Sequence, residues 1–215
     1  APHLETAALG LWVEAGSRFE SAEINGVSHV LEHMAFKGTA RRSAQDIVEQ
    51  IEAVGGHLNA YTSREQTAYH ARVLKDDVGL AIDILADILQ NSVFAEDELA
   101  REREVIVHEI GEAIDTPDDL IFDHFQDAAY PDQPLGRSIL GPVEIVADMP
   151  RETLLDYMAG HYSAPRMVFS AMGRVDHDEI VAQAAEAFGA LATRNDASQA
   201  PARYIGGERR TTREL

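Results

Sequence analysis

A short segment near the amino terminus, His29-Val-Leu-Glu-His33, places two histidines four residues apart with a glutamate between them. On a helix, residues i and i+4 share one face, so both imidazoles can reach a single metal ion. Glu32 projects beside them, close enough to act on a metal-bound water. The spacing predicts a metal-ligating helix and requires a fold that brings a third ligand to it.

The residues around this segment give the helix two opposed faces. Four apolar residues follow the i, i+3, i+4, i+7 spacing of a core-facing stripe: Val27, Val30, Leu31 and Met34. Four others with the same spacing share the opposite side: His29, Glu32, His33 and Phe36. The alternative to a metal site is a solvated helix face that carries two histidines and a glutamate by chance.

Composition narrows the classes of partner and metal. The chain has 215 residues, of which 45% are hydrophobic, enough for one large domain or one domain and a fragment. No apolar run approaches the length of a membrane span, and no signal peptide is visible. Because the chain has no cysteine, a transition metal must be held by histidine and carboxylate. The net charge of −19 disfavours nucleic acid and favours basic ligands, while also promoting solubility.

Periodicity and turn residues predict the order of the secondary structure. We expect strands at 7–15, 57–62, 66–74 and 167–172. We expect helices at about 25–36, 44–54, 76–90, 96–115, 119–129, 151–162 and 176–188. Ser43 and Asp46 predict a capping box at the start of the second helix. Strands occur as a hairpin and singly among helices, without regular βαβ alternation, which favours an α+β fold with an antiparallel-rich sheet.

The predicted helix 96–115 offers a third ligand. Four residues form its apolar stripe: Leu99, Ile106, Ile110 and Ala113. Glu102 and Glu109, two turns apart, project into this stripe, whereas His108 points away from it. A buried carboxylate is costly unless it pairs with a cation or binds a metal. The two acids therefore indicate a cation on the inner face. The alternatives are pairing with Arg or Lys of a neighbouring element, and a stripe that lies partly at the surface.

Three segments together resemble the pitrilysin/insulinase family of zinc metallopeptidases, the inverzincins. They are Gly-Val-Ser-His-Val-Leu-Glu-His-Met-Ala-Phe-Lys-Gly-Thr (26–39), Arg-Glu-Arg-Glu-Val-Ile-Val-His-Glu-Ile (101–110) and Gly-Gly-His-Leu-Asn-Ala-Tyr-Thr-Ser-Arg-Glu (55–65). Within the family, the chain is most similar to processing-peptidase β subunits and their bacterial relatives. The resemblance implies a sheet covered by helices on one face. It also implies a first half of a two-half protein, with a peptidase domain at 1–192 and a linker and start of a second half at 193–215.

The resemblance assigns roles at the metal site. His29, His33 and Glu109 would ligate one zinc ion per chain. Glu32 would be the general base for a water activated by the zinc. Glu102 would be a further acid that orients the site. A purely structural module has no need of Glu32.

The resemblance also assigns residues that contact substrate. A peptide would add as a strand to the sheet edge at 58–62, where Asn59 and Ala60 would bind its main chain. Phe36 would line the pocket just after the scissile bond. Asp119 and Asp123, at i and i+4 on the helix after the third ligand, would bind an arginine upstream of the cut.

The expected function is therefore a zinc endopeptidase that cleaves extended, basic peptides or unfolded proteins. Its expected partner is a second homologous half, or another chain in a homodimer or heterodimer. The expected location is the bacterial cytoplasm, with the mitochondrial matrix and the periplasm as alternatives. A different possibility is a non-catalytic half that binds substrate or a partner half. A di-metal helical protein is more remote, because no second Glu-x-x-His set is convincing.

Overall fold

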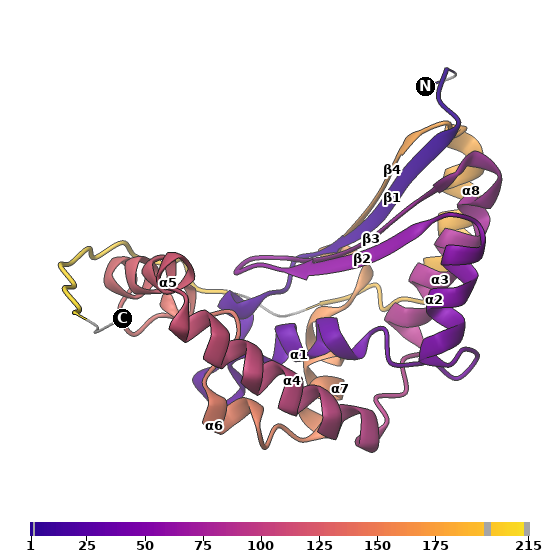
Figure 1. Ribbon diagram of the computed structural model, residues 1–215. Helices are drawn as coiled ribbons and strands as arrows, with labels where there is room; N and C mark the ends of the chain where they lie inside the picture. Colours follow the sequence, from indigo (N-terminus) through magenta and orange to yellow (C-terminus); the bar gives the residue numbers. More distant parts are fainter. Residues whose placement is uncertain (2, 196–198, 213–215) are drawn as a thin grey trace.

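The fold is built on one antiparallel sheet, shown in Figure 1 from a computed structural model that describes residues 1, 3–195 and 199–212. The sheet has the order β2–β3–β1–β4. Its strands are β1 (Thr6–Val13), β2 (His57–Thr62), β3 (Thr67–Leu74) and β4 (Met167–Gly173). The strand β1 pairs with both β3 and β4, so Leu11 lies opposite Tyr69 on one side and Phe169 on the other. This arrangement leaves β2 at an edge.

The described part of the chain has eight α-helices. They are α1 (Val27–Met34), α2 (Ala44–Ala53), α3 (Val78–Gln90), α4 (Glu96–Asp115), α5 (Pro117–Ala129), α6 (Val143–Val146), α7 (Arg151–His161) and α8 (His177–Phe188). Short 3-10 helices include η1 (Ser17–Phe19), η2 (Ala22–Ile24), η3 (Lys75–Asp77), η4 (Pro134–Gly136) and η5 (Ala164–Arg166). In Figure 1, α2, α3 and α8 cover one face of the sheet, while α1, α4, α6 and α7 gather at the lower end.

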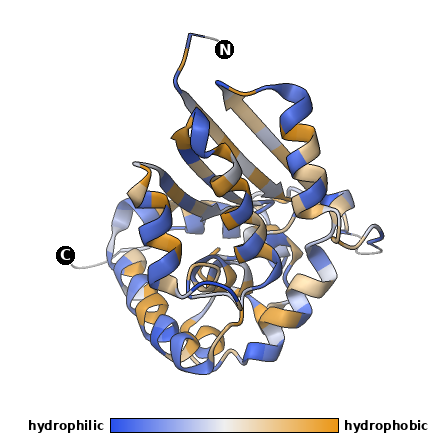
Figure 2. Ribbon diagram, turned by 90° about the vertical axis from the view of Figure 1, so that its right-hand side faces the viewer, coloured by the Kyte–Doolittle hydropathy of each residue, from blue (hydrophilic) through white to orange (hydrophobic). Residues whose placement is uncertain are grey.

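The core lies between the sheet and the helices packed against it, with α3 at its centre and α1 and α4 at its lower end. Alternate residues of β1 point inward, and Leu9, Leu11 and Val13 are buried there. The helix α3 contributes an almost continuous apolar surface that includes Leu85 and Ile88. In Figure 2, viewed from the helix side, apolar and polar residues form separate bands along the helices, as expected for helices with one core-facing side.

The opposite face of the sheet carries exposed apolar residues. Val168 and Met172 of β4 are examples, 65% and 76% exposed. Helices therefore cover one face of an antiparallel sheet, and the predicted α+β fold class is confirmed.

The predicted elements agree with the observed ones apart from their ends and the shortest pieces. The capping box is present, because Ser43 Oγ accepts from Asp46 N at 3.1 Å and the Asp46 carboxylate accepts from Ser43 N at 2.9 Å. The motif helix is shorter than predicted at both ends: Gly26, with a left-handed φ of 102°, precedes its start, and it ends at Met34. The helix α5 starts at Pro117, earlier than predicted, because proline is well suited to a first helical position. The four-residue α6 was not predicted, since it is too short to show periodicity.

The carboxy-terminal segment is consistent with a polar, irregular stretch. Its described residues form no helix or strand, and Ile205 N donates to Ala129 O at 3.0 Å. Residues 196–198 and 213–215 of the predicted linker lie outside the described residues. The division at residue 192 stays a prediction. Across the described ranges, no helix combines the length and apolar character that crossing a membrane requires.

Candidate metal centre

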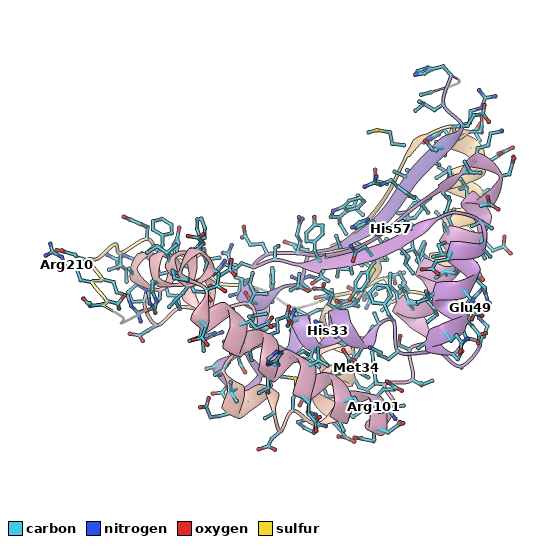
Figure 3. All side chains as sticks on the ribbon, viewed as in Figure 1. His33, Met34, Glu49, His57, Arg101 and Arg210 are labelled. Atoms are coloured by element: carbon cyan, nitrogen blue, oxygen red, sulfur yellow. The ribbon has the colours of Figure 1, made fainter. Side chains whose placement is uncertain are left out.

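The motif helix α1 buries both of its faces, to different degrees. Val27, Val30 and Met34 are 0% exposed in the core. The opposite face turns toward α4, and His29 on it is only 7% exposed. Figure 3 places the α1 side chains, His33 among them, beside the middle of α4. The alternative of a fully solvated histidine face is therefore wrong.

Two histidines of α1 meet one glutamate of α4. His29 Nε2 and His33 Nε2 each lie 3.6 Å from Glu109 Oε2. One ligand atom from each of the three residues lies within 4.8 Å of the others. Tetrahedral zinc with bonds of about 2.0–2.1 Å needs ligand atoms roughly 3.3 Å apart. The three side chains therefore need only a small adjustment to hold one zinc ion.

The protonation states at this group suit a metal. Burial, assisted by the charge of His33, lowers the pKa of His29 to about 4. His29 is therefore neutral near pH 7, with a lone pair available for a cation. Glu109 Oε2 is buried and accepts no hydrogen bond from any described residue. A buried carboxylate oxygen without a donor is the kind of atom that a bound cation would satisfy.

Glu102 orients one of the two histidines. It is buried, with Oε2 at 3.0 Å from His33 Nδ1 and Oε1 at 2.5 Å from Lys37 Nζ. A proton on His33 Nδ1 then donates to Glu102 and leaves Nε2 free toward Glu109. Burial acts to raise the pKa of Glu102, but hydrogen bonds from Lys37 and His33 outweigh it, so the pKa is lowered overall.

Two details of the sequence-based argument need correction. The cation beside Glu102 is the ammonium group of Lys37. For this acid, the alternative of pairing with a lysine of a neighbouring element therefore holds. Lys37 lies beyond the end of α1, so no helical spacing in the sequence could have revealed this pair. Glu109 is not enclosed as expected, because its side chain is 44% exposed where it borders a cleft. His108 does point away, with a side chain 80% exposed.

The cleft beside Glu109 has a volume of about 580 Å³ and brings together residues from distant parts of the chain. Glu32 lines it, next to His29 and Glu109. Asp119 and Asp123 of α5 also line it, as the proposed contacts to a basic residue require. Asp123 already has a cationic neighbour, because Arg64 Nη2 donates to its Oδ1 at 2.8 Å. Arg64 was not singled out from the sequence.

The edge strand β2 joins this cleft to a smaller pocket. Phe36, Leu58 and Asn59 line a pocket of about 310 Å³, and Tyr61 and Thr62 at the other end of β2 line the main cleft. Ala60 is 9% exposed, and its N–H donates to Asn59 Oδ1 at 2.8 Å. The main cleft thus gathers Glu32, His29 and Glu109 with Asp119 and Asp123, whereas Phe36 and Asn59 line the smaller pocket and Ala60 lines neither. Asn59 covers the main-chain N–H of Ala60.

An antiparallel sheet whose edge strand runs beside a histidine–histidine–glutamate group is the arrangement expected of a metallopeptidase. Comparison with protein families gives the same class. Residues 1–143 match the family described as "Insulinase (Peptidase family M16)", and residues 148–214 match "Peptidase M16 inactive domain". Since the first match covers more than half of the chain, the protein belongs to the insulinase family of peptidases.

Curated relatives carry zinc protease and processing peptidase names. A Rickettsia felis protein named "Uncharacterized zinc protease" is 45% identical over 100% of this chain and 52% of its own length. The human mitochondrial-processing peptidase subunit beta is 46% identical over 95% of this chain and 42% of its own. A probable subunit beta from Arabidopsis thaliana is 49% identical over 95% and 39%. The chain spans about half the length of the relatives it matches, or less.

Solved structures share the fold at low sequence identity. A protease from Helicobacter pylori superposes with a TM-score of 0.86 at 20% identity, over 94% of this chain and 49% of that one. A peptidase M16 inactive domain from Pseudomonas fluorescens gives a TM-score of 0.82 at 20% identity, over 97% and 50%. These likenesses support the fold described above.

Proposed function

We propose that this chain is the zinc-binding half of an endopeptidase, with one zinc ion held by His29, His33 and Glu109. The observation that carries the proposal is the meeting of these three side chains at the cleft that Glu32 lines. When bound, zinc supplies a Lewis acid at the scissile carbonyl and makes a nearby water more acidic.

The chain's own residues then handle the proton and hold the ligands. The Glu32 carboxylate takes a proton from the attacking water and returns it to the leaving amine nitrogen, as a general base and then a general acid. Glu102 keeps His33 in the tautomer that leaves Nε2 free. Lys37 keeps Glu102 ionised, because it provides the matching charge.

An extended peptide would add to the free edge of β2. Main-chain hydrogen bonds along an edge strand give affinity with little demand on side chains. Asn59 would have to release the Ala60 N–H before a peptide carbonyl could accept from it. The side chain after the scissile bond would enter the pocket that Phe36 and Leu58 line.

A preference for basic peptides would come from the acids of α5. Replacing Asp119 with Asn is expected to lower kcat/KM about tenfold for a peptide with arginine upstream of the cut, the worth of one charged hydrogen bond. No described cation pairs with Asp119, whereas Asp123 is already paired with Arg64. A matched peptide with glutamine in place of arginine should be cleaved equally well by both proteins.

The control for that comparison is Asp118→Asn, which removes the same charge from the first turn of α5 outside the cleft. Asp118→Asn should cleave both peptides with the kcat/KM of the wild type. An equal loss on the arginine and glutamine peptides with Asp119→Asn would contradict a role in reading the basic side chain.

The whole protein would pair this chain with a second homologous half, since the relatives it matches are about twice as long. That half could belong to the same polypeptide or to another subunit. The relatives are bacterial and mitochondrial proteins by name, consistent with a bacterial cytoplasmic location or the matrix.

Metal analysis combined with a cleavage assay tests the proposal. One zinc ion per chain is expected, and a chelator should remove both the zinc and the hydrolysis of a basic presequence-like peptide. The assay is run with and without the second half. Zinc without cleavage until that half is added would indicate a division of labour between halves. A folded chain that binds no zinc would contradict the proposal.

A further inference from the structure

A fully buried carboxylate lies behind the start of the motif helix. Glu20 is 2% exposed, lies just after η1 and is not one of the residues that line the cleft. Its Oε2 accepts from Gly26 N at 2.7 Å and from Asn25 Nδ2 at 2.8 Å. Its Oε1 accepts from Ser28 N at 2.9 Å. Three donors thus converge on one side chain.

The helix α1 depends on these contacts because it lacks a cap of its own. Its N-cap residue is Gly26, which has no side chain to accept from the first turn. The first N–H groups of a helix have no partner within the helix and need an acceptor when buried. Helices this short are marginal alone. Glu20 supplies the acceptor oxygens, and its negative charge suits the positive end of the helix.

Ser28, whose N–H donates to Glu20, adjoins the proposed zinc ligand His29. Ser28 immediately precedes His29, and Ser28 Oγ donates to Tyr157 Oη at 2.9 Å. The Ser28 carbonyl accepts from Thr62 Oγ1 at 3.3 Å, at the end of the edge strand. These contacts with Glu20, Tyr157 and Thr62 fix the position of Ser28. They thereby fix the backbone position of His29, the next residue.

The same carboxylate is tied to the cleft wall. Asn25 Nδ2, which donates to Glu20, also donates to Ser138 O at 3.1 Å. Ser138 lines the cleft. Arg137, its neighbour, donates to the main-chain oxygen of Glu20. Glu20 thus connects the start of α1 with a segment that lines the cleft.

We propose that Glu20 is a positioning residue of the metal centre: its buried carboxylate fixes the first turn of α1 and thereby the placement of His29 and Glu32 against Glu109. The proposal rests on the proposed zinc site. It predicts that removing the charge of the Glu20 carboxylate weakens zinc binding by more than a general loss of stability explains.

The test compares Glu20→Gln with Asp87→Asn, a matched change of a buried carboxylate on α3. Zinc affinity is measured by competition with a chelating dye, well below the melting temperature of each protein. Glu20→Gln is expected to lower the affinity about tenfold, at the low end for residues that orient ligands. Asp87→Asn should reduce Tm and leave zinc affinity within about twofold.

Hydrogen exchange of the metal-free proteins adds a readout that does not depend on zinc. Glu20→Gln should speed amide exchange in α1 and leave α3 unchanged, whereas Asp87→Asn should do the reverse. If Glu20→Gln fails to fold, Asn25→Ala takes its place, with a loss of about fivefold expected from one hydrogen bond.

The outcomes separate this proposal from the function on which it rests. Zinc affinity within about twofold of wild type for a folded Glu20→Gln, at a reduced Tm, would make Glu20 a structural residue only and overturn the positioning role. A wild-type chain that binds no zinc would instead overturn the proposed function. In that case, amide exchange in α1 of Glu20→Gln that equals the wild type would overturn the role of Glu20 as well.

Discussion

Replacing Glu32 with Gln is expected to slow peptide hydrolysis by a factor of about 10² to 10⁴, the usual contribution of a general acid–base group. Glutamine keeps the shape of the side chain and loses the ability to accept the proton of water. The three proposed zinc ligands are other residues, so the variant should still bind one zinc ion. Single-turnover hydrolysis of a basic peptide, with zinc content measured in the same sample, checks both parts.

The matched control is Glu104→Gln, which makes the same change on the exposed side of α4. It should alter neither zinc content nor rate. Normal cleavage by the zinc-loaded Glu32→Gln protein would show that another group takes the proton. A variant that loses zinc as well as activity would show that Glu32 acts as a ligand or supports one.

Replacing Asp87 with Asn is expected to reduce the free energy of unfolding by about 3–5 kcal/mol, the cost of breaking a buried ion pair. Asp87 is 0% exposed on α3. Its Oδ2 accepts from Arg42 Nη1 at 2.7 Å and from Thr39 Oγ1 at 2.8 Å. Its Oδ1 accepts from Asn91 Nδ2 at 2.9 Å and from Arg41 Nε at 3.1 Å. Because an amide carries no charge, the guanidinium groups of Arg41 and Arg42 would lose the Asp87 carboxylate as an ionic partner.

Denaturant unfolding measures that loss, and Asp83→Asn is its control. Asp83 pairs with the same two arginines, but its side chain is 45% exposed. The expected loss there is about 1 kcal/mol or less, because water screens an exposed pair. Equal losses for the two variants would mean that burial at Asp87 adds nothing to the ion pair.

The stability of the wild type should also depend on pH through Asp87. Burial alone would raise the pKa of Asp87, but hydrogen bonds from Arg42, Thr39, Asn91 and Arg41 bring it below the ordinary value of 3.8. The folded pKa is thus the lower one, so the carboxylate stabilises the fold above pH 3.8 and loses that effect as the pH falls through the folded pKa. The Asp87→Asn variant should lose less stability than the wild type across this acidic range.

The local elements could be predicted from the sequence because each depends on neighbours within a few residues. The capping box at Ser43 and the span of α4 need only local rules and are confirmed. The edge position of β2 is different. It depends on which strands pair, and β1 is joined to β4 from far along the chain. Periodicity contains no information on that choice.

The candidate site divides in the same way. The spacing of His29, Glu32 and His33 puts their side chains on one side of a helix whatever the rest of the chain does. The inward direction of Glu102 followed from the stripe of α4, whereas Glu109 on the same stripe borders the cleft and is 44% exposed. Which acid approaches the histidines most directly did not follow from the stripe, because that depends on how α4 crosses α1.

The sequence by itself determined that His29, Glu32 and His33 share one helix face, that two acids lie on the stripe of a long helix, and the α+β class, since backbone periodicity sets which side chains share a face. Only the tertiary structure decided that Lys37 neutralises Glu102, that Arg64 occupies Asp123 and that Glu20 holds the start of α1. These contacts join separate elements. Their partners are selected by packing and by the cost of burying an unpaired charge, which no local pattern records.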